Sequence, residues 1–150
     1  MAATAWVLYN RAIRKLGAGV IVLPGAVRVA LVKSASNFAT STLSLWGSVT
    51  QQVTSGFGYS TSGKTLTGEA WTTGTSGGQI KFDVTDPVWS AAGGNITSIK
   101  AAVLFMSGAA AGSCHVLGWA QLSTAAFNLN SGNSLTLVMN SAGVFTVANV

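Results

Sequence analysis

Cys114 and His115 are the one adjacent pair of potentially reactive side chains in this 150-residue chain. A thiol and an imidazole can act as nucleophile and base when the two side chains meet within hydrogen-bond distance. These two lie in a stretch with the alternation of a β-strand, in which neighbouring side chains point to opposite faces. We therefore predict that the pair is not catalytic, that Cys114 is a buried thiol, and that His115 is exposed or hydrogen-bonded.

The three acidic residues are the other candidates for chemistry. A carboxylate pair can hydrolyse glycosides, but Asp83 is more simply an outward-facing strand residue and Asp86 a turn residue before Pro87. One His, one Cys and three carboxylates at these spacings do not predict a metal site. The chain also lacks a phosphate-binding loop, a dinucleotide fingerprint and a nucleophile elbow. We predict a protein that is not an enzyme and that has no metal and no cofactor.

The composition predicts a β-protein that works inside an assembly. Hydrophobic residues make up 49% of the chain and charged residues only 7%, whereas an ordinary soluble domain has about a quarter charged residues. Ser, Thr, Asn and Gly fill the remaining polar positions, as is typical of β-structure. A secreted or surface β-domain is the alternative interpretation of the same composition.

The net charge of +5 predicts an acidic partner surface rather than a specific nucleic acid. No run of five basic residues occurs, and aromatic residues do not alternate with basic ones as a base-stacking surface requires. The basic side chains are nevertheless enriched in the first quarter of the chain, at Arg11, Arg14, Lys15, Arg28 and Lys33.

The single cysteine excludes an internal disulfide, which suits assembly in a reducing cytoplasm. No charged segment followed by an apolar segment marks a signal peptide at the N-terminus. The most hydrophobic window, Leu16 to Val32, is short, is interrupted by Pro24-Gly25 and contains Arg28. We therefore expect a soluble or assembled protein without a membrane partner.

The length fits one domain, residues 1–150, with an N-terminal helical arm (1–17) and a β-sandwich (18–150). Apolar residues recur at helical spacing from Ala5 to Leu16, and Gly17 is expected to supply the left-handed cap. The helix can pack on its own sheet or on a neighbouring subunit, and the pattern leaves both possibilities open.

Two stretches define the expected sheet. Gln79 to Val84 alternates, which places Ile80, Phe82 and Val84 on one buried face. Ile96 to Met106 ends in a continuous apolar run, as expected for a central strand that is covered on both sides.

The remaining strands are expected around these two, and the last two of them are expected to form a closing hairpin. The segment from Ser34 to Ser48 is expected to be a long connection. About eight short strands predict an all-β fold, a single jelly-roll-like β-sandwich with a short N-terminal helix. The further expected strands are Val20–Leu23, Val27–Lys33, Val49–Thr54, Lys64–Leu66, Glu69–Thr72, Cys114–Leu122, Ser134–Met139 and Val144–Val147.

Aromatic residues near loops raise a different function class, because aromatic rings can stack on sugars. Core and corner packing is the favoured interpretation, since most of these residues lie in or beside expected strands. A carbohydrate- or receptor-binding module stays as an alternative, and exposed loop aromatics would distinguish it. The residues concerned are Trp46, Phe57, Tyr59, Trp71, Trp89 and Trp119.

The chain resembles small structural proteins of tailed bacteriophage particles. In place of the acidic residues that related sequences tend to carry after the first helix, it has Ala18 to Pro24, which leaves a more apolar surface. The resemblance lies in Leu8–Ala12 leading to Val27–Val32, in Gly63–Gly68, in Phe82-Asp83 leading to Val88–Gly93, and in Gly132–Leu135 leading to Ser141–Val144.

This resemblance implies a virion component, assembled in the host cytoplasm, of the decoration or cement class that binds the head shell. The implied partners are the major capsid protein and further copies of this chain, and a tail or connector component is the alternative within virions. A glycan would be a partner only for the carbohydrate-binding alternative. The residues expected to touch a partner are Trp6, Tyr9, Arg11, Arg14, Lys15, Leu23 and Arg28.

Overall fold

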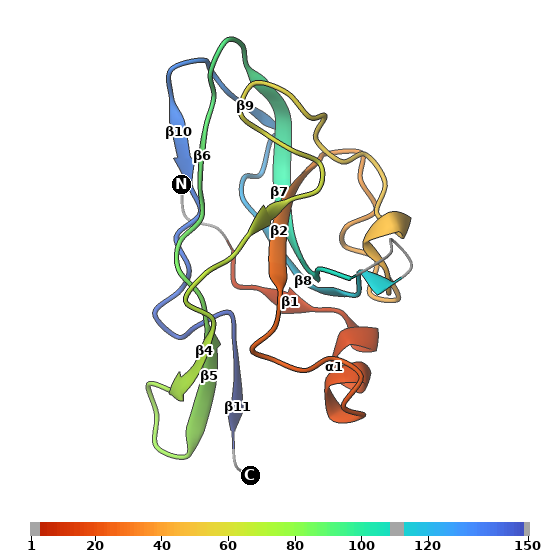
Figure 1. The fold of residues 1–150 in the computed structure, drawn as a ribbon, viewed down its shortest axis with the longest axis vertical. Helices are drawn as coiled ribbons and strands as arrows, with labels where there is room; N and C mark the ends of the chain where they lie inside the picture. Colours follow the sequence, from red (N-terminus) through yellow and green to blue (C-terminus); the bar gives the residue numbers. More distant parts are fainter. Residues whose placement is uncertain (1–3, 109–112, 149–150) are drawn as a thin grey trace.

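A long strand, β7 (Ile96–Met106), lies at the centre of the largest sheet of the protein (Figure 1). We describe the protein with a computed structural model, in which residues 4–108 and 113–148 are described. The prediction that this strand is central is confirmed, because β7 pairs antiparallel with three other strands. The sheet has the order β1-β8-β7-β2-β3, with β9 also on β7, and its other strands are β1 (Val7–Leu8), β2 (Val27–Lys33), β3 (Lys64–Thr65), β8 (Val116–Gln121) and β9 (Phe127–Leu129).

Two smaller antiparallel sheets complete an all-β, sandwich-like fold. One consists of β6 (Val88–Ser90) and β10 (Ser134–Thr136), and the other has the order β11-β5-β4, with β4 (Ala70–Thr73), β5 (Gln79–Asp83) and β11 (Phe145–Ala148). The predicted closing hairpin is therefore wrong, because β10 and β11 pair with different strands. The Asn140–Gly143 turn does form, but Leu137 and Met139 before it are buried in the main core, which draws the two strands apart.

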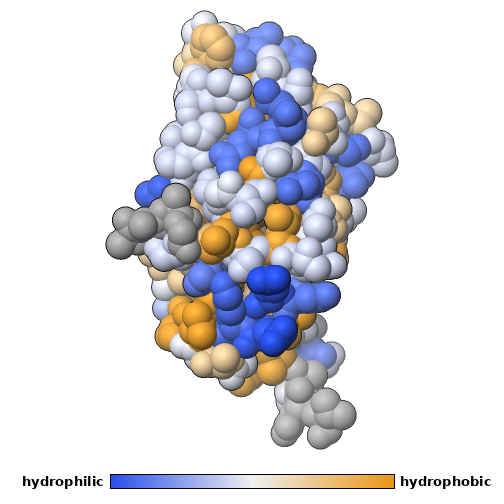
Figure 2. Space-filling view, turned by 90° about the vertical axis from the view of Figure 1, so that its right-hand side faces the viewer, coloured by the Kyte–Doolittle hydropathy of each residue, from blue (hydrophilic) through white to orange (hydrophobic). Residues whose placement is uncertain are grey.

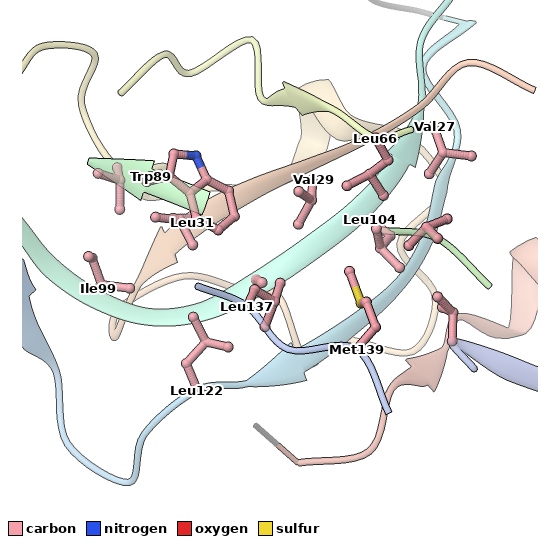
Figure 3. Close-up of a cluster of buried hydrophobic side chains, with 14 of the residues drawn as sticks. Val27, Val29, Leu31, Leu66, Trp89, Ile99, Leu104, Leu122, Leu137 and Met139 are labelled. Atoms are coloured by element: carbon pink, nitrogen blue, oxygen red, sulfur yellow. The ribbon is translucent and has the colours of Figure 1, made fainter. Parts of the chain in front are cut away.

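Both faces of the central sheet are buried, as the continuous apolar run of β7 predicts. On one face, Leu104 and its neighbours on β2 pack against Trp89, Leu137 and Met139 (Figure 3). On the opposite face, Val103 and Phe105 are covered by the helix and by the connection that contains a 3-10 turn at Trp46–Ser48. Trp46 stacks on Phe105 with ring centroids 4.6 Å apart. The chain thus covers its central strand with non-strand segments on one side.

The helix α1 (Asn10–Gly17) is shorter than predicted and packs on its own sheet. Val7 and Leu8 form β1 instead, and Leu8 lies opposite Gly118 of β8. Gly118 permits this approach, because a Cβ there would lie 2.8 Å from the Val7 carbonyl oxygen. The predicted glycine cap is also displaced: the C-cap residue is Ala18, and Gly19 has the positive φ of 69°.

Three further expectations are corrected by the fold. Val20–Leu23 is not a strand, because the N–H groups of Val20 and Ile21 both donate to the Lys15 carbonyl and turn the chain back on α1. Val49–Thr54 makes only an isolated bridge between Gln52 and β2. Ile80 is exposed, since β5 extends beyond the body that covers Phe82. In the described part of the chain, no helix is long and apolar enough to cross a membrane.

Candidate partner-binding surface

The exposed face of α1 carries three cations. Arg11, Arg14 and Lys15 are three and four positions apart, so their side chains leave the helix on the same side. The opposite side of α1 buries Ala12 and packs Leu16 against the core. Among the residues that the structure describes, the guanidinium groups of Arg11 and Arg14 have no hydrogen-bond or ion-pair partner. Arg11 and Arg14 are thus available to an anionic group from outside.

Lys15, by contrast, is held by the protein itself. Its Nζ donates to Ser44 Oγ at 3.0 Å and lies 2.7 Å from Nδ1 of His115. Burial lowers the pKa of the Lys15 ammonium, and the positive charge of Arg11 adds to this effect. Burial is also the largest cause that lowers the pKa of His115, and the positive charge of Lys15 lowers it further. A hydrogen bond with the Ser44 backbone acts in the opposite direction. The site is therefore a basic cluster around a neutral imidazole.

The structure places Cys114 and His115 in different surroundings. His115 is hydrogen-bonded, as predicted, and its ring serves Lys15 of α1. Cys114 is half-buried rather than buried, and its carbonyl accepts the N–H of Trp46. Both residues lie just before β8 and contact the Ser44–Trp46 segment, His115 through an isolated bridge with Leu45.

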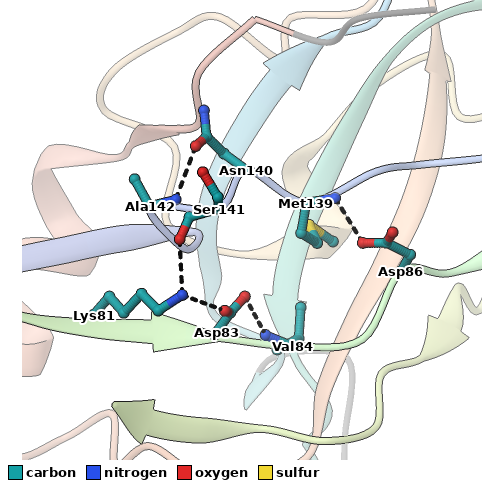
Figure 4. Close-up of polar contacts among 8 residues, drawn as sticks. All are labelled: Lys81, Asp83, Val84, Asp86, Met139, Asn140, Ser141 and Ala142. Carbon is teal, nitrogen blue, oxygen red and sulfur yellow. Dashed lines mark hydrogen bonds and ion pairs between the residues drawn. The ribbon is translucent and has the colours of Figure 1, made fainter. Parts of the chain in front are cut away.

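The three carboxylates are each bound to the protein's own backbone. Glu69 accepts the N–H groups of Gly25 and Val27 at 2.8 and 3.0 Å. Asp83 pairs with Lys81 at 2.9 Å and accepts the N–H of Val84, and Asp86 accepts that of Met139 (Figure 4). Within residues 4–108 and 113–148, no three His, Cys, Asp or Glu side chains could hold a metal ion. The acidic groups therefore organise turns.

An apolar groove lies beside α1. One wall is formed by the end of the helix and the loop that follows it, and the other by the face of the β11-β5-β4 sheet. Trp71 joins the two walls, because its indole N–H donates to the Leu23 carbonyl at 2.9 Å. The lining residues are Leu16, Gly17, Ile21, Val22, Leu23, Trp71, Phe145 and Val147.

Exposed apolar side chains extend this groove outward. Val22 and Val147 are 67% and 54% exposed, and Ile80, the register partner of Val147, is 52% exposed. On α1, Ile13 is exposed beside the basic residues. The side of the molecule that carries α1 shows strongly hydrophilic side chains directly next to hydrophobic ones in its lower half (Figure 2). An exposed apolar patch rimmed by polar residues is typical of an interaction surface or a ligand-binding groove.

The structure separates the residues that the sequence groups as partner contacts. Tyr9 is a correction: it is fully buried, and its hydroxyl donates to the Phe38 carbonyl at 2.6 Å, so it is a core residue. Arg28 donates to the Ser62 carbonyl on the β3 side of the sheet. Trp6 and Leu23 are half-buried against the main core. Arg11 and Arg14 are exposed, and the other partner candidates apart from Tyr9 are half-buried, namely Trp6, Lys15, Leu23 and Arg28.

Sequence reasoning missed the second wall of the groove. Phe145 and Val147 alternate with Thr146, a signal that places both on one strand face. That signal cannot show which strand lies beside them, and the pairing with Phe82 and Ile80 comes from the tertiary structure. Comparison with protein-family models, curated proteins and solved structures finds no match for this chain.

Proposed function

We propose that this protein is a non-enzymatic structural component of a virion, a decoration or cement protein that binds the head shell of a tailed bacteriophage. The resemblance of the sequence to tailed-phage structural proteins suggests the class of protein. One structural observation supports a binding role: an open apolar groove lies at the end of α1, the helix that carries the free cations, on a chain with few charges. Permanent interfaces bury apolar surface at their centre and keep charges at the rim. The groove and the basic face of α1 have this arrangement.

The partner of this surface is the major capsid protein, and neighbouring copies of the chain meet on the shell. A clamp on a shell needs a rigid body more than a reactive site, and both faces of the central sheet are buried here. The three carboxylates and His115 serve turns and packing, which leaves binding as the function of the exposed surface.

A glycan-binding function has less support. Trp46, Tyr59 and Trp89 are buried and cannot stack on a sugar. Phe57 is the exposed loop aromatic of this group, and a single ring in a loop makes a poor sugar platform. Trp71 is partly exposed, but it lines the apolar groove beside α1.

Co-sedimentation with empty phage heads tests the proposal. The wild-type protein is expected to sediment with the heads at a fixed stoichiometry, and the double variant R11E/R14E is expected to remain in the supernatant. Deletion of the arm would be uninformative, because Tyr9 and Ala12 are core residues. Charge reversal at two exposed positions avoids that problem.

The matched control is K33E/K100E, which changes the net charge by the same amount. Lys33 pairs with Ile99, next to Lys100, at the end of β2 and β7 opposite the Val27–Met106 end. This control is expected to sediment with the heads as the wild type does. Binding to isolated tails but not to heads would instead support the tail or connector alternative, and binding to neither would contradict the proposal.

A further inference from the structure

We propose that the groove and α1 together bind an apolar protein segment flanked by carboxylates, and that this segment belongs to a different chain rather than to a second copy. This inference rests on the proposed function and names the chemistry of its partner. The groove supplies the apolar wall residues, and Arg11 and Arg14 supply the charges beside it.

The identity of the partner follows from the charges of the chain. Glu69, Asp83 and Asp86 are the three acidic side chains of the protein, and each already accepts backbone N–H groups. A second copy carries the same net charge of +5, with eight basic and three acidic side chains, so it brings mainly positive charge to the α1 cations. The complementary acidic side chains must therefore come from another protein.

The shape of the surface favours a protein segment over a lipid or a nucleic acid. The groove has two walls between which a chain segment can lie, with Leu16 and Phe145 packed on the core and Val22 and Val147 exposed at its edge. A nucleic acid would present a row of phosphates, and the cations on α1 form one short cluster beside apolar residues. An extended apolar segment with acidic residues at its ends fits both halves of the surface.

Leu16 links the apolar groove to the basic face of α1. Leu16 packs on the core and lines the groove, and it directly follows Lys15 on the helix. Lys15 is tied to Ser44 and His115, so the helix end is held at a constant position relative to β8. A partner therefore meets a preformed surface, which reduces the ordering that binding requires.

Two synthetic 12-residue peptides test the inference, one (Val/Glu) with a central Val stretch flanked by Glu and one (Val/Lys) with the same stretch flanked by Lys. Amide NMR signals of the full protein are followed during titration. The Val/Glu peptide is expected to shift the signals of α1 and of the groove walls, and to bind at least tenfold more tightly than the Val/Lys peptide. R11E/R14E is expected to reverse this preference, and K33E/K100E is expected to retain it.

A second variant disrupts the apolar half by placing a carboxylate in it, and leaves Arg11 and Arg14 unchanged. Val22 is exposed on the loop, so V22D is expected to fold normally. It is expected to weaken binding of the Val/Glu peptide by about tenfold or more. Equal binding of both peptides by the wild type would overturn the inference. Binding of phosphatidylglycerol vesicles but not of the Val/Glu peptide would also overturn it, as would self-association that V22D abolishes.

The two proposals fail separately. Wild-type binding to phage heads without discrimination between the peptides would overturn this inference and leave the decoration function intact. Discrimination between the peptides without binding to heads would support the inference and contradict the decoration function.

Discussion

Lys15 of α1 and His115, at the start of the β8 region, share a hydrogen bond of 2.7 Å although they are 100 positions apart in the chain. An ammonium group has no lone pair, so Lys15 donates and Nδ1 of a neutral imidazole accepts. The contact therefore requires that His115 carry no proton on this nitrogen. Two basic side chains hold the helix to the sheet because one of them is uncharged.

Stability should decrease on mild acidification because of this contact. The pKa of His115 in the folded protein lies below its ordinary value of 6.5, so the unfolded state binds more protons as the pH falls through 6.5. The free energy of unfolding is expected to be lower at pH 5.5 than at pH 7.5. Urea denaturation followed by tryptophan fluorescence measures it. His115→Gln should reduce this difference, and an unchanged difference would contradict the assignment.

Removing the Lys15 charge should raise the pKa of His115. Burial is the larger cause of the low value and remains in Lys15→Met, so only a partial return toward 6.5 is expected. NMR titration of the His115 ring proton gives the pKa directly, and this is the one histidine of the chain. Arg14→Met removes a neighbouring charge that is not a cause of the shift and serves as the control. A pKa of His115 that is lower in Lys15→Met than in the wild type would contradict the geometry.

Tyr9→Phe should destabilise the protein without weakening partner binding. The Tyr9 hydroxyl is buried and donates to the Phe38 carbonyl at 2.6 Å, and burial raises its pKa well above the ordinary range. Loss of the hydroxyl leaves that carbonyl without its side-chain donor, at a cost of about 1–3 kcal/mol in the free energy of unfolding. Chemical denaturation measures this cost. A loss of shell binding in a variant that is still folded would return Tyr9 to the partner surface.

Gly118→Ala should loosen β1. A Cβ at this position would lie 2.8 Å from the Val7 carbonyl oxygen, so the backbone of β1 must move away. The expected destabilisation is about 1–3 kcal/mol, as for other overpacked sites, with faster hydrogen exchange at Leu8 and Tyr9. Gly47→Ala is the control, because a Cβ there meets no atom within 4 Å. Equal effects of the two substitutions would contradict the pairing of β1 with β8.

Glu69→Ala should destabilise the turn that begins β2. The carboxylate accepts N–H groups from Gly25 and Val27, and hydrogen bonds to a charged group contribute about 1.5–3 kcal/mol. The free energy of unfolding is therefore expected to fall by about 2 kcal/mol or more. The structurally conservative Glu69→Gln keeps one acceptor and should lose less. An unchanged denaturation midpoint in Glu69→Ala would show that water replaces the carboxylate.

The side-chain periodicity of the sequence was sufficient to predict the strands β2 and β7, which lie in the middle of the largest sheet. β2 alternates from Val27 to Lys33, and the apolar run of β7 indicates cover on both faces, as the structure confirms. It failed at Val20–Leu23, where two N–H groups bond to the Lys15 carbonyl, and at Val7–Leu8, where a helical pattern forms a strand. In both places a contact with a distant or preceding backbone outweighs local preference.

The candidate site shows the same division. The spacing of Arg11, Arg14 and Lys15 by itself determined that these cations share one helix face. That Lys15 is held by His115, that Tyr9 is buried, and that Phe145 and Val147 form a groove with Leu23 were decided only by the tertiary structure. A side-chain period specifies which residues share a face, whereas the register between strands and the cover over each face depend on residues far away in the chain.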